Sequence, residues 1–428
     1  MQESVLFGYL AVAKQNSITM RKNSHFSGQP LYGQVIKLLD KSKILYFSRE
    51  NGGERYTKRF NCWIHLVVML YAVIMRFDSL REITASLLAE TRKLAHFGIT
   101  FKIGRSTLAD ANKRRPEAIF EAIYRDLYAT YRHVLSSDSQ SHKTPKWMKR
   151  LQIIDSTTIT LFSNLLFKGV GRHPKTGKKK GGIKVHTVIH ANEGVPSDIK
   201  FTSAATNDSF MLKPTTLSKG DIMAMDRAYI DYAKFQQLTE RGVIYVTKMK
   251  KNLKYSVLSD TMYQTPDGLM EVRIQNVEFV KQIRGGETIH HKSRIITYVD
   301  AKKRKLISLL TNDMDSDPDE IIAIYRQRWE IELLFKQMKQ NFPLKYFYGE
   351  SANAIKIQIW VTLIANLLLM VMQKGLKRQW SFSGLATMVR ITLMYYVDFH
   401  SLFNNPEKEW EIILSEASGA PPLPTLFD

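Results

Sequence analysis

The segment LQIIDSTTITL, residues 151–161, limits the folds that this chain of 428 residues can adopt. Its isoleucines and threonines are β-branched, and β-branched residues favour strands. Two segments of the same kind follow, IKVHTVIHA at 183–191 and SDIKFTSAA at 197–205, and the turn residues 192–194 separate them. The three segments predict an antiparallel meander of three strands.

Helices and strands alternate after this meander. A short helical segment at 207–217 is followed by DIMAMD at 221–226, a second helix at 232–241 and VIYVTKM at 243–249. The two apolar runs predict buried strands, and strands that alternate with helices favour parallel pairing. Together with the meander they predict an α/β fold with one mixed sheet covered by helices.

The flanking regions have other patterns. Apolar residues at helical spacing fill much of 1–135, residues 136–149 are polar, and residues 252–305 combine short alternating runs with Asp-Gly and Gly-Gly turns. We therefore expect five parts. They are a helical N-terminal region (1–135), a linker (136–149), a central domain (150–251 and 306–375), a β-rich insertion (252–305) and a helical C-terminal region (376–428).

The charge of the chain favours a polyanionic partner. Lysine and arginine outnumber aspartate and glutamate by 62 to 40, a formal net charge of +22. Nucleic acid is the first expectation and an anionic membrane the second. The most apolar stretch, 357–372, is shorter than a membrane span requires and predicts a buried helix, so we expect no membrane partner. The single cysteine, Cys62, excludes an intrachain disulfide framework.

The helical N-terminal region, residues 1–135, is expected to bind DNA, and two basic segments of the chain are candidates for DNA contact. A helix from about Ser79 is followed by glycine turns and by a second helix from Ser106 that stops before Pro116, which favours a helix-turn-helix, although helical bundles share this pattern. The run at 171–184 combines glycines with lysines and is either a solvated hairpin loop or a contact to the DNA backbone. The cations concerned are Lys113, Arg114 and Arg115 in the helix, and Lys178, Lys179 and Lys180 in the run.

Two aspartates follow apolar runs. Asp155 comes directly after QII and Asp226 after IMAM, so we expect both at or near strand ends, where their side chains can converge. Converging carboxylates bind hard cations such as Mg²⁺, which a phosphodiester enzyme needs beside a basic groove. The alternative for either residue alone is a turn or cap role.

The segment YRQRWEIELLFKQMK, residues 325–339, carries a third acid. One helical stripe about 21 Å long contains an acid among a tyrosine, an arginine and a lysine, which suits a metal ligand surrounded by phosphate binders. Glu330 is turned away from the stripe, and Trp329 is expected in the core. The alternative is a solvated face with internal ion pairs. The stripe consists of Tyr325, Arg328, Glu332, Phe335 and Lys339.

Three segments together resemble a known family. The spacing of Tyr325, Arg328, Glu332 and Lys339 resembles the signature of one large group of insertion-sequence transposases with a DDE catalytic domain. IIDSTTI at 153–159 and MDRAY at 225–229 resemble the segments that supply this group's two aspartates. The resemblance covers roughly residues 152–373 and implies a ribonuclease-H-like catalytic domain interrupted by the β-rich insertion.

The resemblance also implies a chemistry. Asp155, Asp226 and Glu332 would be catalytic and would hold two Mg²⁺ or Mn²⁺ ions, and Tyr325, Arg328 and Lys339 would bind phosphates of double-stranded DNA. A homodimer would cut the element's ends and join them to target DNA in the bacterial cytoplasm, at the nucleoid. The alternatives are a nuclease that cuts without joining and a catalytically silent DNA-binding repressor.

The sequence departs from the family pattern at one point. Members of this group commonly pass through a DNA hairpin, with a flipped base stacked on an aromatic residue, often a tryptophan of the insertion. No tryptophan lies between Asp226 and Arg328. The remaining candidates for this stacking are Tyr255, Tyr263, Phe279 and Tyr298.

Overall fold

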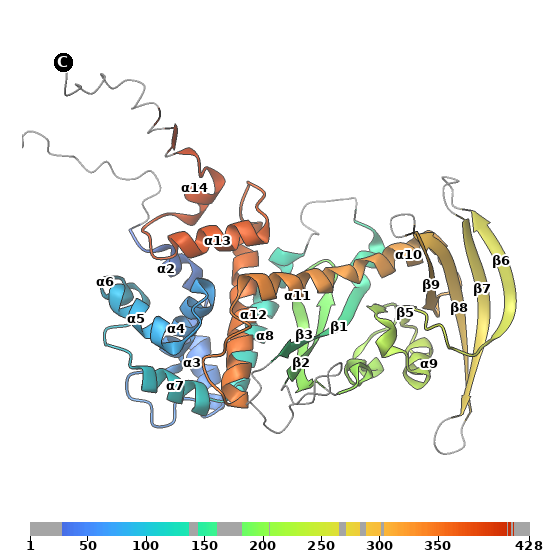
Figure 1. Ribbon diagram of the computed structural model, residues 1–428, viewed down its shortest axis with the longest axis horizontal. Coiled ribbons are helices and arrows are strands. Elements are labelled where there is room, and N and C mark those ends of the chain that lie inside the picture. Colours follow the sequence, from blue (N-terminus) through green and yellow to red (C-terminus); the bar gives the residue numbers. More distant parts are fainter. Residues whose placement is uncertain are drawn as a thin grey trace, which may run out of the picture.

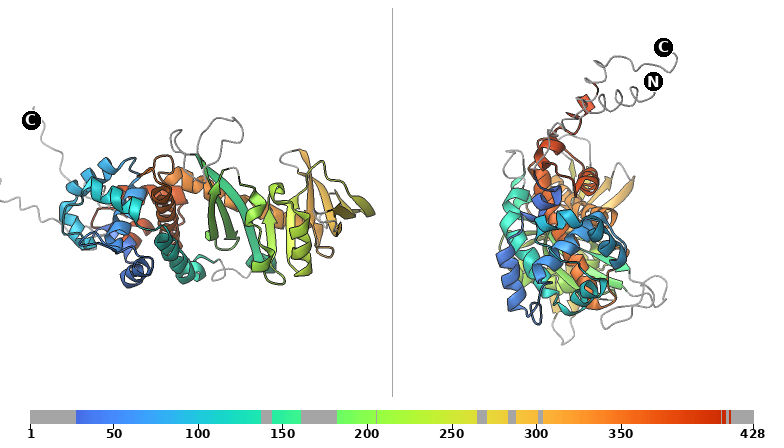
Figure 2. Two further views of the ribbon diagram at one scale, coloured as in Figure 1. Left: turned by 90° about the horizontal axis from the view of Figure 1, so that it is seen from below. Right: turned by 90° about the vertical axis from the view of Figure 1, so that its left-hand side faces the viewer.

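The computed structural model shows an elongated molecule with a helical bundle at one end, a mixed sheet in the middle and a β-rich part at the other end (Figures 1 and 2). This arrangement agrees with the α/β class expected from the sequence. The residues that the structure describes are 28–136, 144–160, 182–204, 206–264, 271–282, 288–300, 304–408, 410–411 and 414.

The central sheet has the predicted meander and the predicted parallel strands. Strand β1 pairs antiparallel with β2, which pairs antiparallel with β3, while β4 and β5 run parallel to β1, giving the order β3-β2-β1-β4-β5. This is the strand order of the ribonuclease-H-like fold. The strands are β1 (Leu151–Thr160), β2 (Gly182–His190), β3 (Pro196–Ser203), β4 (Ile222–Met225) and β5 (Ile244–Lys248).

Side chains of β1 alternate between two cores, because successive residues of a strand point to opposite faces. Ile153 packs in the larger core with residues of helices α8 (Ala118–Leu135), α11 (Trp329–Asn341) and α12 (Ala352–Lys374). Ile154 packs in a smaller core with helix α9 (Tyr232–Glu240). Residues 155 and 157 therefore face α11, and residue 156 faces the smaller core.

The β-rich insertion continues the central sheet. Strand β9 pairs antiparallel with both β5 and β8, so nine strands form one sheet in the order β3-β2-β1-β4-β5-β9-β8-β7-β6. The sequence places the return to the central domain at residue 306, yet β9 belongs to both parts. The added strands are β6 (Ser256–Gln264), β7 (Glu271–Gln282), β8 (Thr288–Asp300) and β9 (Lys305–Thr311).

The N-terminal bundle is organised around α4 (Cys62–Met75), in which every residue from Cys62 to Ile74 is buried. The cationic helix α7 spans Arg105–Arg114 with Gly104 as its N-cap, so it begins one residue before the start at Ser106 that the sequence indicates. The remaining helices are α2 (Leu31–Ile36), α3 (Lys41–Glu50), α5 (Leu80–Ala89), α6 (Thr91–Leu94) and α8 (Ala118–Leu135).

Helix α12 (Ala352–Lys374) joins the bundle to the sheet and packs against α4, α7 and α8. It is long and apolar enough to cross a membrane, but 89% of its apolar window is buried inside the protein. Its buried polar groups are also satisfied: Gln358 donates to the Pro343 carbonyl at 2.8 Å, and Asn366 accepts from Gln337 at 2.8 Å. The predicted buried core helix is therefore confirmed.

The single helix expected for residues 325–339 is part of two helices, α10 (Pro318–Gln327) and α11 (Trp329–Asn341), with Arg328 between them. The Arg328 amide donates to the Tyr325 carbonyl, three residues back, at 3.1 Å. This is a tightened 3₁₀-type turn, and the helix axis continues across it (Figure 1). Two further helices, α13 (Phe382–Thr392) and α14 (Phe399–Asn404), lie toward the C-terminus.

Candidate active site

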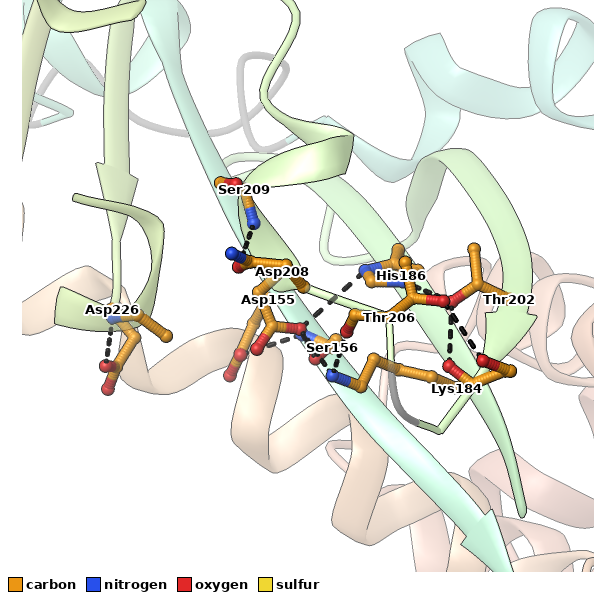
Figure 3. Close-up of polar contacts among 12 residues, drawn as sticks. Asp155, Ser156, Lys184, His186, Thr202, Thr206, Asp208, Ser209 and Asp226 are labelled. Atoms are coloured by element: carbon orange, nitrogen blue, oxygen red, sulfur yellow. Dashed lines mark hydrogen bonds and ion pairs between the residues drawn. The ribbon is translucent and has the colours of Figure 1, made fainter. Parts of the chain in front are cut away.

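Asp155 and Asp226 lie next to each other on neighbouring parallel strands. Ile154 is in register with Met225, and each aspartate follows directly (Figure 3). Asp226 comes after the last residue of β4, as expected, and its carboxylate accepts from the Ala228 amide at 3.0 Å. Asp155 is not at a strand end, because β1 continues to Thr160 through its pairing with β2. Only the partner strand β4 ends there, which leaves the Asp155 side chain accessible.

Helix α11 brings Glu332 to the same face. One guanidinium nitrogen of Arg328 lies 2.6 Å from a Glu332 oxygen, and the other lies 3.8 Å from a carboxylate oxygen of Asp155. Arg328 therefore links the acid of the helix to the acid of the strand. Glu330, on the opposite side of α11, is exposed. The acids of three distant segments therefore lie near enough to influence one another electrostatically.

The carboxylates influence each other electrostatically. Burial raises the pKa of Asp155 from 3.8 to about 6, against the lowering effects of the Ser156 amide and Arg328, and the negative charges of Asp226 and Glu332 raise it further. Asp155 and Glu332 share one guanidinium, and the charges of Asp226 and Glu332 repel that of Asp155, so a bound cation would relieve this repulsion. The site is therefore an environment in which positive charge is favourable.

Tyr325 and Lys339 extend the site along the helix. The Arg328 guanidinium lies 5.7 Å from the centre of the Tyr325 ring, and burial raises the pKa of Tyr325, with a smaller contribution from Asp226. Lys339 donates to the Thr157 hydroxyl at 2.6 Å, and burial lowers the pKa of its amine. The stripe thus contacts β1 through Arg328 at Asp155 and through Lys339 at Thr157. Lys339 also lines a polar recess of about 340 Å³ with residues that include Arg76 and Lys345.

The donor set fits a hard divalent cation in its chemistry, since it consists of carboxylate oxygens. Among the residues that the structure describes, no three acidic, histidine or cysteine side chains are arranged closely enough to hold one ion. Arg328 lies between Asp155 and Glu332 in this arrangement. Its Nε is buried and has no hydrogen-bond partner within the described ranges.

A polar network lies on the opposite face of β1 (Figure 3). The Asp208 carboxylate accepts from the Ser156 hydroxyl at 2.6 Å and from the Lys184 amine at 3.1 Å, and the His186 ring lies 3.9 Å away. His186 is fully buried, and its other nitrogen contacts the Thr202 hydroxyl at 2.7 Å. Because Ser156 is the neighbour of Asp155, this network fixes the strand from behind.

Sequence reasoning did not identify Asp208, which lies in a short 3₁₀ turn, Asp208–Met211, within the predicted helical segment 207–217. The signal was present in β2. Lys184 and His186 are two residues apart in an otherwise apolar strand, and a buried cation requires an anionic partner. That partner had to come from a segment following β3, where Asp208 stands.

The predicted DNA-contact residues of α7 have different surroundings. Lys113 and Arg114 are exposed, but Arg115 is 6% exposed and does not point to solvent. Its guanidinium donates to the backbone carbonyls of Gly53, at 3.2 Å, and Phe60, so the expectation of a surface contact at Arg115 is wrong. The sequence could not reveal this, because the two carbonyls lie more than fifty residues away. Lys178, Lys179 and Lys180 are outside the described residues.

The aromatic residues also depart from expectation. Phe279 is 1% exposed and Tyr298 is 3% exposed, so neither ring offers a face to a flipped base. Tyr255 is 37% exposed and packs against Phe279. Trp329, expected in the core, is 52% exposed on α11 beside Arg328. Trp329 follows the stripe residue Arg328 by one position, about 100° around the helix, and this turns its side chain outward.

A ribonuclease-H-like sheet with acids from β1, β4 and the helix beyond the insertion defines a class of enzymes that act on phosphodiester bonds. The comparisons agree: residues 146–368 match the family model described as transposase DDE domain, and residues 27–100 match one described as a domain of unknown function (DUF4372). The chain belongs to the transposase DDE domain family. It is a DNA transposase, and this family uses divalent metal ions.

The chain is also similar to individual proteins. The chain is 29% identical over 268 residues to the putative transposase y4zB of Sinorhizobium fredii (strain NBRC 101917 / NGR234), covering 63% of this chain and 71% of the relative. It is 23% identical over 290 residues to the probable transposase for insertion sequence element IS5377 of Geobacillus stearothermophilus, covering 68% and 73%. A piggyBac transposase synaptic complex with hairpin DNA aligns with a TM-score of 0.41 at 11% identity, over 95% of this chain and 88% of that one.

Proposed function

We propose that this transposase cuts the ends of an insertion sequence and joins them to target DNA, with Asp155, Asp226 and Glu332 as the ligands of two divalent ions, Mg²⁺ or Mn²⁺. The observation that carries the proposal is the contact of Arg328 with both Asp155 and Glu332. It brings an acid of the helix beyond the insertion to the strand that carries the first acid. Such bound ions activate the attacking oxygen and stabilise the leaving oxygen.

The protein's own residues would do the rest. Arg328 is held between two carboxylates, and once cations neutralise these, its guanidinium is available for a phosphate oxygen of the substrate. Lys339 lies beside β1 through Thr157 and lines the polar recess, so its amine can hold a second phosphate. Tyr325 packs on Arg328 and restricts the orientation of the guanidinium. Cutting and joining exchange one phosphodiester bond for another, so no nucleotide cofactor is required.

Other parts of the proposal concern assembly. Two paired ends require two active sites, so we expect a homodimer on DNA, with the C-terminal helices α13 and α14 as the candidate surface for pairing. The DNA substrate would be that of a bacterial nucleoid, in the cytoplasm. A hairpin intermediate is part of the same proposal. The membership of this chain in the group with the tyrosine, arginine, glutamate and lysine signature rests on the spacing of residues 325–339.

The test incubates the purified full chain with duplex DNA from its own element's end, with and without Mg²⁺, and separates the products on a denaturing gel. We expect nicked and joined products that require the metal and that are lost in Asp155→Asn. Cutting without joining would instead indicate a nuclease. Specific binding without any metal-dependent product would indicate a silent repressor.

A further inference from the structure

A basic groove lies in the N-terminal bundle, away from the acids of the active site. It encloses about 740 Å³ between the loop that joins α3 to α4, residues 51–61, and helix α7 with the segment before it. Six cations and one carboxylate line this N-terminal groove. The carboxylate, Asp110, is paired with Arg114 at 3.2 Å. The cations are Arg55, Lys58, Arg59, Lys102, Arg114 and Arg115.

The loop is held rigidly from the inside. The Glu54 carboxylate points away from the groove and accepts from the Ser48 hydroxyl at 2.7 Å and the Cys62 amide at 2.8 Å. Arg115 donates to the carbonyls of Gly53 and Phe60, one near each end of the loop. A Cβ at Gly53 would lie 2.3 Å from the Ile119 side chain, so this close approach requires glycine. The loop therefore presents its cations from a fixed backbone.

The groove also contains an unusual aromatic residue. Tyr56 is 88% exposed and has a φ of +60°, a left-handed conformation that costs a residue with a Cβ about 1 kcal/mol. The Arg55 guanidinium lies 5.2 Å from the centre of its ring. Nothing in the packing of the bundle requires an exposed tyrosine there. A basic groove with a projecting aromatic ring is instead the combination that proteins use on nucleic acids.

A second observation points to an anion. Arg115 is buried behind the groove floor, and its Nη1 has no hydrogen-bond partner in the part of the chain that the structure describes. Burial lowers the pKa of Arg115, which an anion close to the guanidinium would offset. The groove thus has a cation behind its floor as well as cations along its rim.

From these observations we propose that the N-terminal groove binds the phosphate backbone of the element's end DNA, with Tyr56 packing against the duplex. This deepens the proposed function and rests on it, since it assumes that the chain acts on element ends. It places DNA contacts in the loop 51–61, which lies within the domain of unknown function matched at residues 27–100. It also moves the expected contact from the helix α7 alone to the loop 51–61, which the sequence analysis did not identify.

The proposal separates two contributions to binding. Arg55, Lys58 and Arg59 supply the salt-dependent part, because each phosphate contact releases counterions and adds about 0.9 to the slope of log affinity against log salt concentration. Tyr56 supplies a part that does not depend on salt. Removing the three charges should therefore flatten the slope, while removing the ring should weaken binding equally at all salt concentrations.

The experiment measures fluorescence anisotropy of the full chain on end duplex between about 50 and 300 mM KCl, a range over which phosphate contacts change affinity strongly. The test variant is Arg55→Gln, Lys58→Gln, Arg59→Gln. The matched control removes three exposed charges outside the groove, Lys37→Gln, Lys41→Gln, Lys374→Gln. We expect the slope to fall by about 2 to 3 in the test variant and by less than about 1 in the control. Tyr56→Ala should weaken binding several-fold at an unchanged slope, and Tyr56→Phe should retain the wild-type affinity.

Equal slopes for the test variant and the control would overturn the inference, provided that both variants melt at the wild-type temperature. In that case the wild type still binds and cuts its end DNA, so the proposed function stands. A wild type that neither binds nor cuts this DNA would refute both proposals. Tighter binding to single-stranded RNA of the same length than to the duplex would overturn the choice of partner.

Discussion

The two faces of strand β1 differ in how their charges are balanced. On the face toward α11, Asp155 and Glu332 share the single guanidinium of Arg328, and Asp226 stands beside them. On the other face, Asp208 has its own cation, Lys184, and a hydroxyl donor. The first face is short of positive charge, and the second is complete. A surplus of carboxylates over cations favours the binding of a cation, so only the first face is proposed as a metal site.

The comparison predicts its largest effect at Glu332. Glu332→Gln keeps the shape of the side chain and removes the charge of the third proposed ligand, so cutting and joining should both fall by about 10³-fold, which corresponds to about 4 kcal/mol. Glu330→Gln, on the exposed side of the same helix, is the matched control and should cost far less. Denaturing gels of end-DNA products measure both variants. The reverse order of effects would show that Glu330 is the third ligand.

A second prediction concerns stability in the absence of metal. The raised pKa of Asp155, about 6 against 3.8, means that the folded state favours the protonated carboxyl. Its stabilising effect is present below pH 3.8 and is lost as the pH rises through about 6. Asp155→Asn should therefore unfold less readily than wild type at pH 8 in EDTA, by up to about 3 kcal/mol, with the difference shrinking toward pH 4.

Thermal denaturation at several pH values measures this difference. The control is Asp208→Asn, whose carboxylate is already paired and should show no such stabilisation at pH 8. A constant difference between Asp155→Asn and wild type at every pH would contradict the charge imbalance described for this face.

The balanced face gives a smaller effect. Asp208→Asn leaves the Lys184 amine, whose side chain is 13% exposed, without its anionic partner, and should destabilise the fold by about 1 to 2 kcal/mol. We also expect this variant to cut more slowly but to need the same concentration of Mg²⁺, since Asp208 positions β1 and would not hold an ion. Titration of the metal in the gel assay tests this. A large increase in the Mg²⁺ needed would instead make Asp208 a ligand.

The smallest effect is expected on the outer side of α11. Trp329 is 52% exposed, so Trp329→Ala should change the free energy of unfolding by less than about 1 kcal/mol, as exposed substitutions usually do. Chemical denaturation measures this change. The contrasting variant is Ile331→Ala, at a fully buried position two residues further along the helix, which should lower the free energy of unfolding by about 2 to 5 kcal/mol. A loss at Trp329 as large as at Ile331 would restore the core role that the sequence suggested.

Much of the fold could be predicted because its patterns are local. Strands β1 to β5 and helix α12 are recognisable from β-branched runs and apolar spacing, and the spacing of Arg328 and Glu332 predicts that they share one face. The closeness of Asp155 to Asp226 follows from the parallel pairing of β1 with β4, although only β4 ends at this level. The role of these acids as ligands stays a prediction.

The features that the sequence could not give depend on distant contacts. Arg115 is buried because Gly53 and Phe60 fold back onto it, and Asp208 is important because Lys184 faces it across the sheet. No regular spacing in the sequence predicts either contact. The groove loop was missed for a related reason: residues 51–61 have no periodicity, and their arrangement is fixed by Glu54 and Arg115 rather than by a helix or strand.

The continuous pairing of β9 with β5 has a mechanical consequence. A domain attached by flexible linkers absorbs a displacement, whereas nine hydrogen-bonded strands form a stiff plate. Helix α10 begins soon after β9 and leads to Arg328, and the Arg294 guanidinium fastens the intervening turn to β8 by a 2.6 Å bond to the Ser316 carbonyl. We therefore expect a displacement of the outer strands to move Arg328, which lies between Asp155 and Glu332.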